Sequence, residues 1–413
     1  MKKKDIPDHF CPQPFTYIHA GVEGGWKPCC KSDILSKVNT FDEWWFEDED
    51  LKQLRHEMLT KPGKMCASVC NIPCYDPERS GRKSYRNSAY DHFMKNDMYF
   101  DIVENYSKTG MAISNNRLFI LKPKGLGNYC NLKCYMCPPH LSSSRSTEMI
   151  KTEPDSIQLF YKKLDDPKGY LQYRIDTANK TTADMTEKYL DIIDSFGDCL
   201  KSINLSGGEP TMIKGFIPIL DKLVEDGHAE EMNLFFNSNM TRLSLLKNNF
   251  TDYFDKFGSV TIQASVDNVG KKDEWMRYPT KFGEVEETIK YLRDTYSNIE
   301  ISVNTTWSLL NIDSAFEIAE FLEENDLPLA FPMNYVDHPR CLNLRNYPHK
   351  QQLYDKYINS DISWIRELAK NIISEDVIEE DLKKAIDYIK NLDKIRNTDA
   401  RDLWPWLKEY YND

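Results

Sequence analysis

The chain has 413 residues, of which 40% are hydrophobic and 29% charged, so it has enough apolar material for a sizeable core. Its formal charge of −12 argues against a general nucleic-acid-binding protein, because phosphate contacts need clustered Lys and Arg. No apolar run is long enough to span a membrane, and no signal-peptide segment follows the basic residues after Met1. We therefore expect a cytoplasmic protein, and the length predicts two or three domains.

Residues 1–95 are expected to form a small cysteine-rich domain. They hold six of the eleven cysteines, many aromatic residues and little regular periodicity. In a cytoplasmic chain such clustering indicates metal ligation and not disulfides. A segment with a weak core of its own would also gain stability from a bound metal. Residues 96–115 are expected to connect this domain to the rest of the chain.

Residues 116–340 alternate between β-rich runs and helical stretches. The expected strands are Leu118–Leu121, Ser202–Ser206, Asn233–Asn237, Ser259–Ser265, Glu300–Thr305 and Leu329–Asn334. The expected helices include Phe216–Glu225, Phe282–Tyr296 and Asp313–Glu324. This α/β alternation predicts a parallel sheet with helices outside, and six units suit an open, partial (βα)6 TIM-like barrel with its active site at the carboxyl ends of the strands. Residues 341–413 are expected to form a helical C-terminal extension.

Three cysteines, Cys130, Cys134 and Cys137, follow the first expected barrel strand. Their spacing would also place them on one face of a helix, where cysteine can simply fill a core. A zinc knuckle with a fourth ligand such as His140 is a second alternative. We favour an iron–sulfur cluster, because three thiolates leave one iron of a cubane open for chemistry.

A second motif, Gly207-Gly208-Glu209, follows the second expected barrel strand. Two glycines let a backbone approach a ligand closely, and Glu209 offers a carboxylate to an ammonium group. By itself this motif would be read as an ordinary turn between a strand and a helix.

Together, Asn128–Cys137 and Ser206–Pro210 resemble the core of the radical S-adenosylmethionine (radical SAM) superfamily. The resemblance covers about residues 115–340. It implies an enzyme that holds a [4Fe–4S] cluster on the three cysteines and binds S-adenosylmethionine (AdoMet) at the open iron. Reductive cleavage of AdoMet would give a 5′-deoxyadenosyl radical that abstracts hydrogen from a substrate. The electron would come from a reductant such as flavodoxin or ferredoxin.

The resemblance also implies contacts to AdoMet. Gly207, Gly208 and Glu209 would receive the methionine ammonium group. Ser265 and Asn304 are candidates for the ribose and carboxylate contacts. Met136, which precedes the third cysteine, would pack on the adenine, because its polarizable thioether can replace the commoner aromatic residue.

The N-terminal cysteines resemble those of twitch or SPASM accessory domains, which hold an auxiliary [4Fe–4S] cluster. The expected ligands are Cys11, Cys29 or Cys30, Cys70 and Cys74, with Cys66 as a contender. A structural zinc site would use the same thiolates. We expect one cluster, because two would need eight cysteines and this segment has six.

Three functions are compatible with these motifs. The first is modification of a peptide, which relatives with such accessory domains often carry out. The second is oxidation or rearrangement of a small metabolite such as a sugar or an amino alcohol. The third is a zinc-binding interaction protein without catalysis. Cys341 is the only catalytic candidate, as a hydrogen donor, although a lone loop cysteine is more often simply packed.

Overall fold

The structure is a computed structural model of the chain. It describes residues 6–21, 25–32, 38, 40–79, 84–94, 99–113, 117, 119–161, 164–241, 250–374 and 376–411. Leu118 and the residues next to the domain limits predicted at 95 and 115 lie outside the described residues.

A seven-stranded sheet forms the centre of the molecule, in the order β2-β1-β3-β4-β5-β6-β7. Its strands are β1 (Tyr17–Ala20), β2 (Trp26–Lys27), β3 (Phe119–Lys122), β4 (Leu200–Leu205), β5 (Asn233–Ser238), β6 (Ser259–Ser265) and β7 (Ile299–Asn304). Only the β1–β2 pair is antiparallel; the other neighbours are parallel. Buried and partly buried residues alternate along β3 and β5, as expected where one face packs on helices and the other faces the barrel interior. The open α/β barrel is confirmed.

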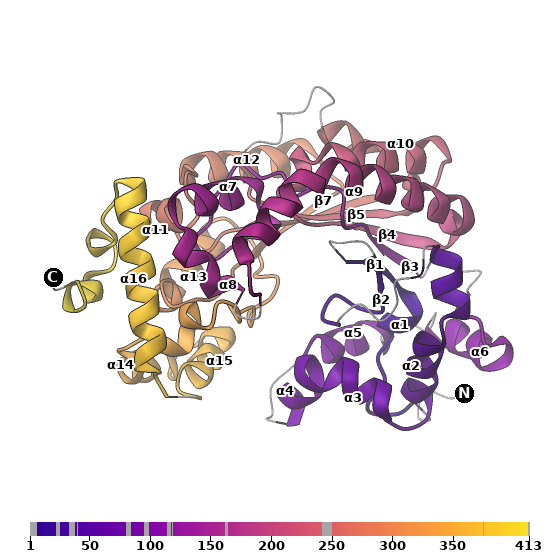
Figure 1. Cartoon of the computed structure of the whole chain (residues 1–413), viewed down its shortest axis with the longest axis horizontal. Helices are drawn as coiled ribbons and strands as arrows, with labels where there is room; N and C mark the ends of the chain where they lie inside the picture. The colour runs from indigo at the N-terminus through magenta and orange to yellow at the C-terminus, as the bar shows by residue number, and fades with distance from the viewer. Residues whose placement is uncertain are drawn as a thin grey trace.

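Helices follow the strands in the chain, and several of them lie over the sheet (Figure 1). They are α9 (Pro167–Phe196), α10 (Ile217–Glu225), α11 (Gly270–Met276), α12 (Phe282–Thr295) and α13 (Ala315–Glu324). The longest, α9, begins where the Asp166 side chain accepts a hydrogen bond from the Gly169 N–H and Pro167 takes the first helical position. Two shorter helices, α7 (Ser143–Thr152) and α8 (Ile157–Phe160), precede it.

The N-terminal segment packs closely against the barrel. Strand β1 pairs in parallel with β3 and so extends the barrel sheet. The buried Trp45 packs edge-on against Phe119 of β3, with ring centroids 5.8 Å apart. Phe41 makes a similar contact with Phe196 of α9 at 5.3 Å. One hydrophobic core therefore runs from this segment into the barrel.

The N-terminal helices are α1 (Gln13–Thr16), α2 (Glu49–Leu59), α3 (Lys64–Cys70), α4 (Asp76–Arg79), α5 (Tyr85–Met94) and α6 (Tyr99–Thr109). The last of these lies in the segment predicted as a connector. In Figure 1 these helices stand at one end of the arch that the barrel forms.

The predicted strand Leu329–Asn334 is wrong. Only isolated bridges form there, between Leu329 and Val303 and between Tyr335 and Trp307. Pro332 lies between the two bridges and has no N–H to donate, so a continuous ladder cannot form. Six strands are nevertheless parallel, because β1 supplies the sixth at the opposite edge of the sheet.

The C-terminal extension is helical, as predicted. It contains α14 (Lys350–Tyr357), α15 (Ser363–Ile372) and α16 (Glu379–Arg396). These helices stand at the other end of the arch in Figure 1. The division into domains at residues 95, 115 and 340 stays a prediction. Among the described residues, no helix combines the length and apolar character that crossing a membrane requires.

Candidate functional site

The cysteine loop follows β3 at the carboxyl end of the sheet. Three serines close it: Ser142 Oγ donates to the Leu132 carbonyl at 2.9 Å and Ser144 Oγ donates to the Cys130 carbonyl at 2.6 Å. The Cys130 N–H donates in turn to Ser143 Oγ at 3.3 Å. These bonds fix the backbone on both sides of the loop and leave the cysteine side chains available.

The backbone next to Cys134 is held from two directions. The Lys133 N–H donates to the carbonyl of Tyr278, just after α11, at 2.7 Å, and the Tyr135 N–H donates to the carbonyl of Met276, the last residue of α11, at 2.9 Å. The carbonyls of the same two residues accept hydrogen bonds from α16, from the Arg396 guanidinium and the Tyr388 hydroxyl, both at 2.6 Å. All four backbone groups are thus paired, so the middle cysteine has a rigid support.

The three thiols lie close enough for their charges to interact. Burial, followed by the charges of Cys134 and Glu209, raises the pKa of Cys130 to about 12. Burial also raises the pKa of Cys137, and the other two thiols add to the effect. The pKa of Cys134 is raised by burial too, against the nearby Arg277 charge. Such thiols become thiolates when a cation binds them, which is what metal ligation requires.

Arg277 supplies positive charge beside this loop. Its side chain is buried and donates a 2.6 Å hydrogen bond to Asp267 Oδ2. The other oxygen of Asp267 accepts from the Thr306 N–H at 2.8 Å. A thiolate-bound cluster carries negative charge, so this anchored guanidinium is suited to offset it.

The Gly-Gly-Glu turn contacts both ends of the cysteine loop. The Gly208 N–H donates to the Leu141 carbonyl at 3.0 Å, and the Glu209 N–H donates to the Tyr129 carbonyl at 2.7 Å. Gly208 has a φ of 52°, and a Cβ there would lie 2.3 Å from the Tyr129 oxygen. Only glycine fits at this position.

The Glu209 carboxylate is buried and ties this turn to β5. It accepts hydrogen bonds from Thr211 Oγ1 at 2.9 Å, Ser238 Oγ at 3.0 Å and the Asn239 N–H at 2.7 Å. Burial raises its pKa, although these hydrogen bonds oppose the shift. The Thr211 N–H also donates to Oε1, at 3.5 Å, whereas Oε2 accepts only the Asn239 bond among the described residues, so Oε2 retains room for a further donor such as an ammonium group.

The remaining predicted AdoMet contacts lie on neighbouring parts of the barrel. Ser265 and Asn304 are paired in register at the carboxyl ends of β6 and β7. The Asn304 side chain accepts a hydrogen bond from Asn334 Nδ2 at 3.3 Å. Met136 is buried within the core cluster next to the cysteine loop. Ser265 and Asn304 are both partly buried, as expected of side chains that face an interior.

Four of the six N-terminal cysteines line one pocket: Cys11, Cys29, Cys70 and Cys74. They come from four separate stretches of chain, before α1, after β2, at the end of α3 and in the turn after it. Burial raises the pKa of Cys70, and charges of the other three lining cysteines and of Cys66 add to the shift. Arg86, which also lines this pocket, donates to the backbone carbonyls of Asp8 and Phe10. The pocket thus joins four thiols with Arg86, whose guanidinium is also ion-paired with Glu78.

The two other N-terminal cysteines do not line this pocket. Cys66 is fully buried on α3, and its N–H donates to Glu57 Oε2 at 2.8 Å. Its pKa is raised to about 11, first by burial and then by the Glu57 charge. Cys30 is partly buried next to Cys29. Cys341 is buried in a 3₁₀ turn that packs against α16, and its role as a hydrogen donor stays a prediction.

Within the described residues, no three His, Cys, Asp or Glu side chains converge as the ligands of a single metal ion would. His140, considered above as a zinc ligand, is instead 2.7 Å from the Tyr161 hydroxyl through its Nδ1.

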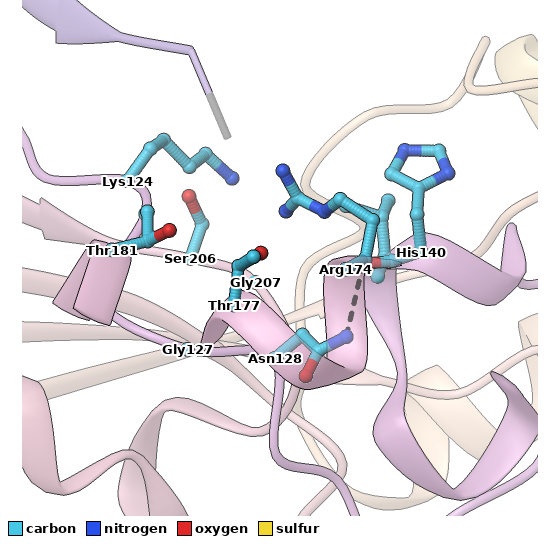
Figure 2. A pocket seen from close by; sticks show the side chains of 11 residues that line it. Lys124, Gly127, Asn128, His140, Arg174, Thr177, Thr181, Ser206 and Gly207 are labelled. Carbon is cyan, nitrogen blue, oxygen red and sulfur yellow. Dashed lines mark hydrogen bonds between the residues drawn. The ribbon is translucent and has the colours of Figure 1, made fainter. Parts of the chain in front are cut away.

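A second pocket, next to the cysteine loop, was missed by the sequence analysis. Its lining includes Lys124 after β3, Ser206 after β4 and Arg174 on α9 (Figure 2). Alternation along the expected strand could have placed Lys124 in the barrel interior, because it follows Lys122 by two residues. Arg174 gave no such signal, since α9 itself was not predicted.

Comparison with known proteins agrees with the motifs. Residues 126–322 match the sequence model of the Radical SAM superfamily. No curated protein matches the chain significantly. Similar solved structures include SuiB of Streptococcus suis bound to S-adenosylmethionine, with 15% identity over 70% of this chain and 57% of that chain and a TM-score of 0.36.

Two further similar structures are native anSMEcpe with bound AdoMet and TYW1 with a lysine–pyruvate adduct. The first has 16% identity over 51% of this chain and 50% of that chain, with a TM-score of 0.31. The second has 16% identity over 51% of this chain and 60% of that chain, with a TM-score of 0.26. The chain therefore spans only part of each of these proteins. The match over residues 126–322, with both motifs inside it, identifies this part of the chain as a radical SAM domain.

Proposed function

We propose that the chain is a radical SAM enzyme whose catalytic [4Fe–4S] cluster is held by Cys130, Cys134 and Cys137. The observation that carries the proposal is the trio of interacting thiols next to the Gly-Gly-Glu turn. When bound, the cluster and AdoMet supply a 5′-deoxyadenosyl radical, formed with one electron from a flavodoxin- or ferredoxin-like reductant, that takes a hydrogen atom from the substrate.

The side chains around this loop would position AdoMet. Gly207 leaves the backbone of the turn open to the methionine end, Gly208 lets the turn lie against the cysteine loop, and Glu209 has an acceptor position for the ammonium. Ser265 and Asn304, adjacent at the strand ends, would contact the ribose and the carboxylate. Met136 would pack on the adenine.

We further propose an auxiliary [4Fe–4S] cluster held by Cys11, Cys29, Cys70 and Cys74. Their common pocket supports this choice among the six N-terminal cysteines. Four thiolates complete the ligation of a cubane and leave no iron open, which favours electron transfer over substrate binding at this cluster. Arg86 would offset part of the negative charge.

We propose a peptide as the substrate, following the resemblance of the N-terminal cysteines to twitch and SPASM domains. The basic pocket around Lys124 and Arg174 favours a second candidate, a small metabolite with an acidic group. Either substrate would react through hydrogen abstraction from a C–H bond.

The proposal is tested by AdoMet cleavage in the anaerobically reconstituted protein with dithionite as the reductant. We expect 5′-deoxyadenosine from wild type and none from Cys134→Ala, because the loop then lacks its middle ligand. Cys199→Ala is the matched control, since Cys199 precedes β4 and so lies at the amino end of the sheet. Equal cleavage by wild type and Cys134→Ala would refute the assignment.

A further inference from the structure

The pocket beside the cysteine loop gathers basic and hydroxyl side chains that have no role in the cluster ligation or the AdoMet contacts proposed above. Lys124 reaches it from the end of β3, and Ser206 from the end of β4. Arg174 reaches it from α9, which lies across the pocket. Figure 2 shows the Lys124 ammonium and the Arg174 guanidinium directed into the same space, with the Ser206 hydroxyl directed toward it from below.

The charge around this pocket is positive. Although the chain has a net charge of −12, no Asp or Glu is among the described residues that line the pocket. The pKa of Lys124 is lowered to about 7, first by burial and then mainly by repulsion from Lys122, with Lys27 adding to it. The same three lysines and burial lower the pKa of the nearby His19 to about 2. Buried cations that repel one another are stabilised when an anion binds.

Two further features indicate room for a ligand. The Ser206 Oγ is buried, and the described residues offer it no hydrogen-bond partner. A buried hydroxyl without a partner is costly, so a ligand that bonds to it restores free energy. Gly207 has a φ of 107°, and a Cβ there would have no neighbour closer than 3.9 Å, one of these being Lys124 Nζ. The turn therefore leaves the space in front of the ammonium open.

We propose that Lys124, Arg174 and Ser206 form an anion-binding subsite that holds the carboxylate or phosphate group of the reacting ligand. Arg174 would present its planar guanidinium to two oxygens of the group, Lys124 would supply a point charge, and Ser206 would donate a third hydrogen bond. Because Asn128 and Leu141, at the two ends of the cysteine loop, also line this pocket, the bound anion would anchor the ligand next to the proposed reaction centre.

The subsite is tested by calorimetric titration of the anaerobically reconstituted protein with inorganic phosphate and with succinate, at constant ionic strength. We expect wild type to bind at least one of these probes. Lys124→Met and Arg174→Gln are each expected to weaken binding at least about tenfold, because each removes a charge-assisted hydrogen bond. Lys180→Met, which removes an exposed lysine of the same helix α9, is expected to bind as wild type does.

Two results would overturn the subsite. One is that wild type binds neither probe; the other is that Lys124→Met and Arg174→Gln bind as tightly as Lys180→Met. Lys124 could instead compensate the charge of the auxiliary cluster. In that case Lys124→Met would change the iron content or the spectrum of that cluster and would bind phosphate as wild type does, which is the second of these results. Circular dichroism of each variant establishes that it is folded before titration.

A second arm identifies the source of the anion. If the group belongs to the substrate, phosphate and AdoMet bind together and Lys124→Met keeps the AdoMet affinity of wild type. If it is the carboxylate of AdoMet, phosphate competes with AdoMet and the same variant loses AdoMet affinity. The inference rests on the proposed function for the identity of its ligand, but phosphate binding requires no AdoMet cleavage. Cleavage without anion binding would refute the subsite alone, and anion binding without cleavage would refute the enzyme proposal alone.

Discussion

The Tyr388 hydroxyl donates a 2.6 Å hydrogen bond to the carbonyl oxygen of Tyr135, although the two residues are 253 positions apart in the chain. Tyr388 lies on α16 and is buried, and it also accepts a hydrogen bond from Arg145. Arg396, at the end of the same helix, bonds to the carbonyl of Lys133. The C-terminal helix therefore supports the backbone on both sides of Cys134, which gives the extension a role at the centre of the molecule.

Removal of this hydroxyl should loosen the cysteine loop. Tyr388→Phe leaves the buried Tyr135 carbonyl without its donor, so we expect a loss of about 1–3 kcal/mol in the free energy of unfolding. A chelator should also remove iron faster from the reconstituted variant than from wild type. Tyr354→Phe, on α14, is the matched control because its ring is only partly buried. Equal stability and iron retention in the two variants would contradict a supporting role for α16.

The N-terminal pocket predicts which cysteines hold the auxiliary cluster. Cys29→Ala should lose about four irons on reconstitution, because Cys29 lines the pocket. Cys66→Ala should keep them, since Cys66 lies outside the pocket lining and its backbone is bonded to Glu57. Iron and sulfide analysis of both proteins checks the assignment. Loss of the cluster in Cys66→Ala with retention in Cys29→Ala would reverse it.

The close approach of Gly208 to the cysteine loop predicts a large effect of one methyl group. Gly208→Ala places a Cβ 2.3 Å from the Tyr129 carbonyl oxygen, so the turn must move away from the loop. We expect roughly 3 kcal/mol or more of lost stability and no AdoMet cleavage.

Gly227→Ala provides the control for this substitution. Gly227 also has a positive φ, of 76°, but nothing lies within 4 Å of its Cβ position. Its replacement should cost only about 1 kcal/mol, from backbone strain alone. Urea unfolding of the two variants distinguishes the effect of backbone strain from that of the contact with Tyr129. Equal losses in the free energy of unfolding would show that this contact is unimportant.

Lys124 should make the stability of the metal-free chain depend on pH. Its folded pKa of about 7 lies below its usual value of 10.5. At low pH the ammonium is charged in both states and the folded chain carries the full cost of burying it. Between about pH 7 and 10.5 the unfolded chain binds more protons, so this residue's contribution to stability rises with pH.

Lys124→Met removes the cost. The variant should therefore have a higher free energy of unfolding than wild type. This difference should be largest at about pH 6 and smaller at about pH 9. Lys180→Met should show no such trend, because Lys180 is exposed. A difference between Lys124→Met and wild type that stays constant with pH would mean that burial does not govern this lysine.

The sequence was sufficient to predict the features that depend on local pattern. Strands β3 to β7 were expected within one or two residues, and both motifs lie at the carboxyl ends of strands as the alternation of strands and helices implied. The strand expected at Leu329–Asn334 failed because Pro332 interrupts its ladder. Pro332 was a local signal against a continuous strand, and the strand prediction did not take it into account.

Features that depend on distant contacts could not be predicted in this way. The pairing of β1 with β3 joins residues about a hundred positions apart, and no periodicity records it. Cys29 and not Cys30 lines the N-terminal pocket because of how the chain after β2 is placed next to Cys70 and Cys74. Arg174 reaches the basic pocket only because α9 lies across it. In each case the position is fixed by packing between segments and not by neighbouring residues.

The central claim is tested most directly by iron and sulfide counts on the anaerobically reconstituted chain and on Cys130/Cys134/Cys137→Ala. Two cubane clusters predict about eight irons in wild type and about four in the triple variant, with 5′-deoxyadenosine formation lost in the variant. An unchanged iron count in the triple variant, or zinc in place of iron in wild type, would contradict the account.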